Sequence, residues 1–342
     1  MELITYLLLS CTLARATRKF LPRLGFAMLV TSGVAAELDF VSYFGGPASF
    51  LRFHRTVLHS LAGTLVMCCC VAGIYFLLDH SGFTKQTLKP GPLTISAALF
   101  VCIAGAAAHI LLDLGGGIGI RLFWPFRSSW QAWDLLPLFD LWIVLVLCAG
   151  LLIPYLARLI SEEIGEHKRG AFGETAARVA LVMVALYTGG RVILHSRVND
   201  LLRSRDYHGE SPQNVAAFAE SSNPFAWRGL VSTSVAIDEL NISLLQGAVF
   251  DPEHAVVHYK PEESAAIAAA QNTADGKLFL NYARFPLAAI EPQDAGSVVS
   301  IRDLRFRASD KSIEHLVLDT TVDVNSQILE QQIHFTGDGR RR

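Results

Sequence analysis

Long apolar runs fill the first part of the chain, and shorter patterned segments follow them. Four runs are long enough to cross a bilayer, because a membrane-spanning helix needs about 20 apolar residues. They cover approximately residues 58–78, 93–114, 138–160 and 176–194. Two earlier apolar stretches, 3–14 and 24–36, are shorter and predict tilted, re-entrant or interfacial membrane helices. The pattern therefore predicts an α-helical integral membrane domain over residues 1–200, with four long and two short helices.

The pattern changes after residue 205. Residues 298–306 and 316–324 partly alternate apolar and polar side chains, and residues 231–250 contain β-rich pieces with Asp and Asn at expected turns. Alternation with a period of two predicts strands. Residues 264–270 predict a short helix. We therefore expect a small soluble domain, mostly β or α+β, over residues 205–336, followed by a disordered tail at 337–342.

Charge and cysteine content narrow the class of protein. The formal net charge is −2, which gives no indication of a nucleic-acid partner. Of the six cysteines, Cys68, Cys69 and Cys70 are adjacent within one apolar run, and the others are scattered. Neither a CxxC metal motif nor a disulfide framework is present. Candidate metal-binding or catalytic residues must therefore be sought among side chains other than cysteine.

Ionisable residues stand at the ends of the apolar helices. Such residues at membrane depth are costly and usually face a cavity or one another, so they indicate a functional site. His109 and Asp113 are four residues apart, which places them on one helical face. Asp113 alone is equally consistent with a solvated helix end, and His109 with a hydrogen bond to a neighbouring group. The pair still predicts a nitrogen and an oxygen ligand for one ion.

A second group lies between the short and long apolar segments. His54 and His59 are five residues apart, so they converge only if His54 lies in a loop and His59 begins the next helix. The alternative is two interfacial histidines at a helix start. Asp39 ends a short apolar run, and a buried carboxylate without a partner is expensive. Arg55 is expected to pair with a carboxylate or to receive an anionic substrate such as a phosphate.

Together these residues form the donor set of a divalent-metal centre. We predict that the ion, zinc, manganese or iron, is bound by the following side chains: Asp39, His54, His59, His109 and Asp113. Glu37 or Asp140, with Arg55, would complete a catalytic site in which a carboxylate accepts a proton from water.

The four long segments place these candidates and the C-terminal domain at one membrane face. That face also carries several arginines: Arg121, Arg127, Arg197, Arg203 and Arg205. Lys85, Lys89, Lys168 and Arg169 lie at the opposite face. The excess of positive charge on the cytoplasmic side of membrane proteins thus predicts a cytoplasmic site and a cytoplasmic C-terminal domain.

Six stretches of the sequence carry a family resemblance. They are residues 37–39, 54–60, 109–113, 119–126, 139–140 and 223–227. They resemble the Asp, His-Arg…His-Ser, His-x-x-x-Asp, Pro-Phe, Phe-Asp and Asn-Pro-Phe-x-Trp elements of the membrane-bound metal-dependent hydrolases, a group of bacterial inner-membrane proteins. The resemblance implies a multi-pass protein of that membrane with a metal-dependent hydrolase activity.

The chain departs from the family pattern at three places. The family has Thr-His near its start, whereas Thr5 is followed here by Tyr6. Its Pro-Asp is Ala36-Glu37, and its Gly-x-Thr-His is the stretch 56–59, which ends in His59. Because Tyr6 stands where the family has a histidine, the site has one histidine ligand fewer than the resemblance implies.

Three functions remain open at this point. The first is a hydrolase acting on an ester or phosphoester, with a lipid-like or phosphorylated substrate and membrane lipid as its surroundings. The second is a non-catalytic membrane protein whose metal site is structural or vestigial and which binds a partner. The third is a proton or metal transporter, which predicts polar residues through the middles of the helices. The runs 58–78 and 138–160 are almost free of such residues, so transport ranks last. The oligomeric state is not indicated by the sequence.

Overall fold

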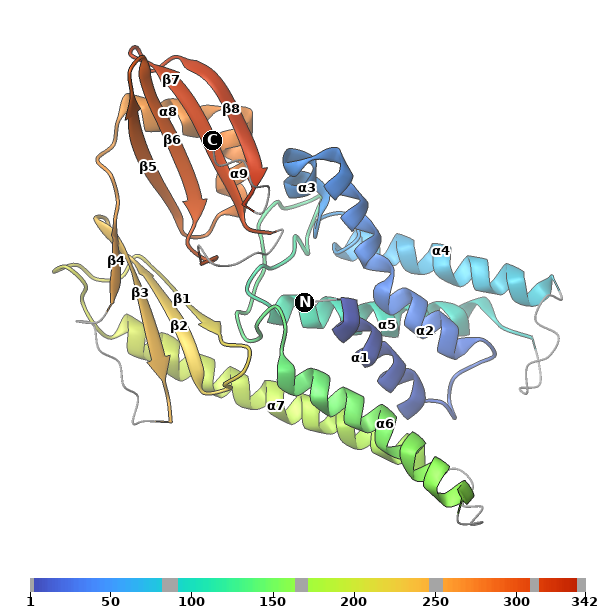
Figure 1. Cartoon of the computed structure of the whole chain (residues 1–342). Helices are drawn as coiled ribbons and strands as arrows, with labels where there is room; N and C mark the ends of the chain where they lie inside the picture. Colours follow the sequence, from blue (N-terminus) through green and yellow to red (C-terminus); the bar gives the residue numbers. More distant parts are fainter. Residues whose placement is uncertain (1–2, 82–91, 164–171, 246–254, 308–313, 337–342) are drawn as a thin grey trace. The chain divides into compact units, whose positions relative to one another are not determined.

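The computed structural model describes residues 3–81, 92–163, 172–245, 255–307 and 314–336 (Figure 1). The chain forms two compact units, which are described separately. The first contains Met1–Asp39, Arg55–Leu194 and Ala219–Pro224, and the second contains Phe40–His54, His195–Phe218 and Phe225–Arg342. The predicted disordered tail, 337–342, lies outside the described residues.

The first unit is built from helices. They are α1 (Leu3–Ala16), α2 (Gly25–Val34), α4 (Leu61–His80), α5 (Ile95–Gly115), α6 (Leu141–Glu163), most of α7 (Phe172–Arg203) and the start of the 3-10 helix η1 (Ala35–Gly45). Within the described part of the chain, five helical stretches are long and apolar enough to cross a membrane: Gly25–Gly45, Leu61–His80, Ile95–Gly115, Leu141–Leu159 and Gly173–Arg203. The predicted helical membrane domain is confirmed.

One helical stretch is longer than its apolar pattern indicated. The run predicted at 24–36 ends at Glu37 and Asp39, where charged residues interrupt the hydropathy. The backbone nevertheless continues from α2 into η1, so Gly25–Gly45 is itself of membrane-spanning length. The carboxylates therefore lie within a helical stretch and not after it.

Side-chain caps fix the start of two long helices. The first amide groups of a helix have no partner inside it, and a Ser or Thr ahead of the helix accepts from one of them. Ser60 Oγ accepts from Gly63 N at 3.0 Å at the start of α4. Thr94 Oγ1 accepts from Ala97 N at 3.4 Å at the start of α5. The cap at Ser60 leaves His59 immediately outside α4.

Glycines allow α2 to approach α5 closely. A Cβ placed on Gly105 of α5 would lie 2.4 Å from Ser32 Oγ and 2.5 Å from the Leu29 carbonyl oxygen, both on α2. A Cβ on Gly33 would lie 2.1 Å from Ser10 Oγ of α1. Three helices therefore meet at van der Waals distance beside His109, around an apolar core that includes Met28, Leu29, Met67, Cys68 and Cys102.

The second unit contains two four-stranded sheets. One has the order β1-β2-β3-β4, from β1 (Asn214–Ala219), β2 (Ala226–Ser232), β3 (Ala236–Ser243) and β4 (Val256–Tyr259). The other has the order β5-β6-β7-β8, from β5 (Pro286–Gln293), β6 (Gly296–Asp303), β7 (Leu316–Asp323) and β8 (Ile328–Phe335). Neighbouring strands from β2 to β4 and from β5 to β8 pair antiparallel. The predicted β domain is confirmed.

Strand alternation explains how the second sheet forms its core. Along β7 every second residue is buried: Leu316, Leu318, Thr320 and Val322. Such alternation buries one face of an antiparallel sheet. Two helices, α8 (Ala265–Asn272) and α9 (Ala274–Tyr282), precede these strands, and α8 includes the predicted helical patch.

The segment Phe40–His54, which begins within η1 and ends ahead of α4, belongs to the second unit. Its helix α3 (Pro47–Phe53) begins with proline at the first position, where the missing amide proton costs nothing. The rings of Tyr43 and Phe50 lie with their centroids 4.9 Å and 5.7 Å from that of Phe335 at the end of β8. Aromatic packing thus attaches this segment to the β domain.

Candidate metal centre

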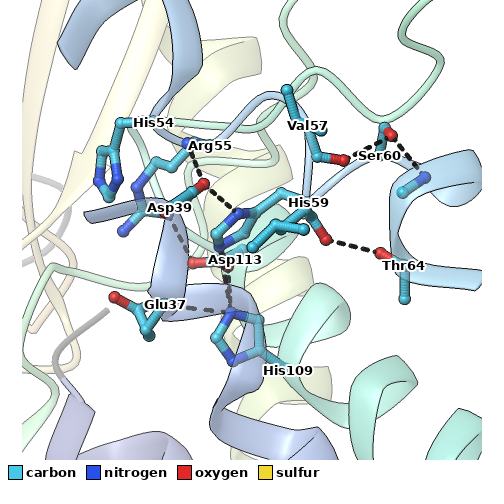
Figure 2. A network of polar contacts seen from close by, with 12 residues as sticks. Glu37, Asp39, His54, Arg55, Val57, His59, Ser60, Thr64, His109 and Asp113 are labelled. Carbon is cyan, nitrogen blue, oxygen red and sulfur yellow. Dashed lines mark hydrogen bonds and ion pairs between the residues drawn. The ribbon is translucent and has the colours of Figure 1, made fainter. Parts of the chain in front are cut away.

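His59 and His109 face each other in the interior of the first unit (Figure 2). The Nε2 atoms of the two rings are 3.2 Å apart, and both side chains are buried. His59 lies just ahead of α4, and His109 lies in the last two turns of α5. Two nitrogens at this distance require a proton or a cation between them, because two lone pairs repel each other.

The other nitrogen of each ring has a fixed role. His109 Nδ1 lies 2.9 Å from the Gly33 carbonyl oxygen, which can only accept, so Nδ1 carries a hydrogen. His59 Nδ1 lies 2.8 Å from Asp39 Oδ2, and it donates in the same way. Hydrogen bonds on Nδ1 set the tautomer and leave Nε2 of each ring for a ligand. Both imidazoles therefore present the coordinating atom toward one point.

Asp113 brings a carboxylate oxygen to the same point. Its Oδ2 lies 3.1 Å from His109 Nε2 and 3.2 Å from His59 Nε2. The pair His109 and Asp113 occupies successive turns of α5, as their spacing requires. The other oxygen, Oδ1, accepts from Arg55 Nη1 and from the Tyr6 hydroxyl, both at 2.5 Å. The two oxygens of Asp113 thus have different surroundings.

Glu37 of η1 completes the cluster. Its Oε1 lies 3.7 Å from His109 Nε2. Glu37, His59 and His109 each offer a ligand atom, and these atoms lie within 4.8 Å of one another. The Glu37 side chain is 21% exposed, whereas those of His59 and His109 are 0% and 1% exposed. Glu37 is therefore the least buried side chain of this group.

The carboxylates control the proton on His59. Burial by itself lowers the pKa of this imidazole, but hydrogen bonds to Asp113 and Asp39 outweigh it and raise the pKa to about 9. At neutral pH the ring therefore holds a second proton. A divalent cation bound at Nε2 would have to displace it.

The donor set fits a divalent metal ion. Two imidazole nitrogens and one or two carboxylate oxygens are typical ligands of zinc and of other first-row metals. The second nitrogen of each imidazole is already held by an acceptor, as ligating histidines usually are. His59, His109 and Asp113 are the residues that would hold such an ion, and the Glu37 carboxylate lies beside them.

Asp39 and Arg55, both predicted site residues, lie beside these donors. Asp39 Oδ2 accepts from His59 Nδ1 and, at 2.8 Å, from the backbone amide of Arg55. Arg55 has a positive φ of 55°, an uncommon conformation for a residue with a side chain. In this conformation its amide bonds Asp39 while its guanidinium bonds Asp113. The two residues connect the support of His59 to the support of Asp113.

His54 and Asp140 are engaged elsewhere. The His54 ring stacks on Phe50 with centroids 4.3 Å apart, and its Nε2 lies 3.5 Å from Glu314 Oε1, within the second unit. Asp140 Oδ1 accepts from the amides of Trp142 and Ile143 at the start of α6, and its Oδ2 accepts from the Tyr187 hydroxyl at 2.9 Å. The structure thus gives His54 a partner in the β domain and gives Asp140 the role of a helix cap.

The sequence profile of the YdjM inner membrane protein family matches residues 1–198, which include all of α1 to α6 and every residue of the metal cluster. The chain belongs to this family. Together with the apolar helices, membership makes the protein a multi-pass inner membrane protein. No curated protein and no solved structure matches the chain.

Two further contributors to the site, Tyr6 and Gly33, are not among the predicted site residues. Tyr6 was noted only as a departure from a family pattern, and the structure places its hydroxyl on Asp113 and its ring on His109. A polar aromatic residue within an apolar run was the available signal. Gly33 contributes a backbone carbonyl, which no side-chain pattern reveals.

Proposed function

We propose that this inner membrane protein is a metal-dependent hydrolase that cleaves an ester or phosphoester bond, with a lipid-like substrate at one membrane face. The observation that supports this most directly is the pair of Nε2 atoms of His59 and His109, 3.2 Å apart with Asp113 Oδ2 within 3.2 Å of each. Donors of this kind converge where they share a cation.

Each residue has a stated role in the proposal. His59, His109 and Asp113 Oδ2 hold the ion, which is zinc, manganese or iron. When bound, a divalent ion acts as a Lewis acid that activates water and polarises the bond to be cleaved. Glu37, which is partly exposed and 3.7 Å from His109, accepts the proton that the attacking water loses. In this role it would replace Asp140, whose carboxylate caps α6.

Arg55 supports the site by binding the carboxylates of Asp113 and Asp39. We predicted that Arg55 either pairs with a carboxylate or receives an anionic substrate. Its Nη1 lies on Asp113 Oδ1 and its amide on Asp39 Oδ2, so we assign it to holding these two side chains. Asp39 likewise holds His59 at Nδ1. The proposal therefore separates three residues that hold the ion from two that hold the ligands.

Metal content of the full-length protein tests the proposal. We expect about one divalent ion per chain in detergent-purified wild type and a loss of affinity of more than about 100-fold in His59→Ala and in His109→Ala, beyond the loss caused by removing a supporting residue. His80→Ala is a matched control, because this histidine is exposed at the end of α4 and contacts the carbonyl and the ring of Phe76 in the same helix.

Two outcomes would overturn parts of the proposal. Wild type without metal after reconstitution would exclude the metal centre. Metal that is lost in both variants, with no hydrolysis of phosphoester or acyl-ester lipids by the loaded wild type, would leave a structural metal site in a non-catalytic protein. The cytoplasmic position of the site and of the β domain remains a prediction from the distribution of arginine and lysine.

A further inference from the structure

Tyr6 of α1 touches two of the residues that the proposed function assigns to the metal. Its hydroxyl donates to Asp113 Oδ1 at 2.5 Å. Its ring lies over that of His109, with centroids 3.9 Å apart and an angle of 29° between the planes. The side chain is 1% exposed. One residue on a separate helix therefore contacts both a carboxylate and an imidazole of the cluster.

The two oxygens of Asp113 have different partners. Oδ1 accepts from Tyr6 and from Arg55, whereas Oδ2 lies toward both imidazoles. A carboxylate oxygen has two lone pairs in the plane of the group. Two donors at 2.5 Å occupy both lone pairs of Oδ1. Only Oδ2 is directed at the imidazole nitrogens.

The stacked ring restricts the second ligand. His109 is fixed at Nδ1 by the Gly33 carbonyl, which sets one direction of the imidazole. Contact with the face of Tyr6 sets the tilt of the imidazole plane, because the ring cannot rotate toward α1. The lone pair on His109 Nε2 is thereby aimed before any ion arrives, and preorganised ligands bind more tightly.

From these contacts we propose that Tyr6 is a positioning residue that makes Asp113 a one-oxygen ligand and aligns His109. The inference rests on the proposed metal centre. It also gives Tyr6 a function at the position where the resembled family has a histidine: the residue shapes the site through its neighbours.

Cobalt(II) titration of the full-length protein tests this inference with a readout other than activity. Four-coordinate cobalt(II) absorbs visible light more strongly than five- or six-coordinate cobalt(II), so the intensity reports how many ligand atoms are bound. In Tyr6→Phe the ring remains and the hydroxyl is lost, which opens Asp113 Oδ1. We expect weaker visible absorption per bound cobalt and an affinity lower by about 10-fold or more.

Tyr75→Phe is the matched control. The Tyr75 hydroxyl lies 2.9 Å from Thr31 Oγ1 in the same helical unit, so this variant also loses a phenol hydrogen bond, but one that does not involve the cluster. We expect wild-type affinity and spectrum. A Tyr6→Phe protein that matches Tyr75→Phe in both respects would overturn the inference while leaving the metal centre intact. Wild type that binds no cobalt would instead overturn the proposed function.

A measurement on wild type covers the case in which Tyr6→Phe does not fold. Metal binding changes the charge on Asp113 and therefore the hydrogen bond from Tyr6. We expect an ultraviolet difference signal from tyrosine that saturates at the same cobalt ratio as the visible band. A visible band that saturates with no tyrosine signal would contradict the inference.

Discussion

Two clusters of buried charge in the helical unit differ in what their atoms face. Asp79 at the end of α4 accepts from the Leu93 amide at 2.9 Å and pairs with Arg23 Nε at 3.1 Å, and both contacts join a donor to an acceptor. At the other cluster, two imidazole nitrogens lie 3.2 Å apart with a carboxylate oxygen beside both. Burial of charge is common to the two clusters. Convergence of two imidazole nitrogens and a carboxylate oxygen on one point distinguishes the metal candidate.

Asp140 extends the same comparison. Its carboxylate is fully buried, yet it accepts from two amides and a phenol, all of which are donors. Asp140 therefore caps α6 and bonds it to α7, and Asp79 ties α4 to the segments that carry Leu93 and Arg23. Only Asp113, among the three aspartates compared here, has an oxygen directed at two imidazole nitrogens.

The substitution Asp39→Asn is expected to have the largest effect among the variants that sharpen this comparison. The carboxylate increases the basicity of His59 through Nδ1, and the amide side chain does so much less. We expect the affinity for zinc to fall about 10- to 100-fold, measured by competition with a chromophoric chelator.

The same change at the other cluster is its control. Asp79→Asn should bind zinc as wild type does, because its contacts do not include the histidines. Equal losses in the two variants would mean that metal binding responds to general destabilisation of the helical unit, and the distinction between the clusters would fail.

The sequence predicted most of the fold because its signals are local. Apolar runs located the membrane helices, and alternation located β6 and β7. The spacing of His109 and Asp113 predicted a shared face because one helix carries both. His59 was expected to converge on them from its place just before a helix, and the structure brings it there.

Other contacts depend on residues far apart in the chain. His54 pairs with Glu314, and no local pattern reports such a pairing. Tyr6 reaches Asp113 from another helix, at a separation of 107 residues. Asp140 stands directly before α6, where an aspartate can cap the helix, and the structure gives it that role. The order of the long segments predicted that the candidates share one membrane face, but not which of them meet.

The pH dependence of zinc binding should show the proton on His59. The folded protein holds this proton up to about pH 9 because hydrogen bonds to Asp113 and Asp39 outweigh the effect of burial on the pKa. Zinc must displace it, so the apparent affinity should rise about tenfold for each pH unit between roughly pH 7 and 9 and then level off.

The same pKa sets the sign of a stability change in the metal-free protein. Because the folded value of about 9 lies above the ordinary value of 6.5, protonated His59 stabilises the fold fully below pH 6.5. This stabilisation is lost as the pH rises through about 9.

For the zinc measurement, an affinity that is constant from pH 7 to 9 would contradict the proton assigned to His59.

The smallest effect on metal binding is expected at the cluster of Asp79 and Arg23, where a substitution should instead lower the stability of the protein. Asp79→Asn keeps an acceptor for Leu93 but removes the charge that pairs with Arg23. We expect the free energy of unfolding to fall by about 1–3 kcal/mol, detected as a lower melting temperature in detergent, with zinc affinity unchanged. A variant with wild-type stability would show that the Arg23 pair contributes nothing to the fold.

X-ray absorption at the zinc edge of the loaded full-length protein tests the central claim most directly. The account predicts two imidazole nitrogens at about 2.0–2.1 Å with oxygen ligands beside them, and the loss of one imidazole signal in His59→Ala. Sulfur scattering at about 2.3 Å would place the ion on cysteine, and a shell of oxygen alone would place it outside the His59–His109 pair. Either result would contradict the metal centre described here.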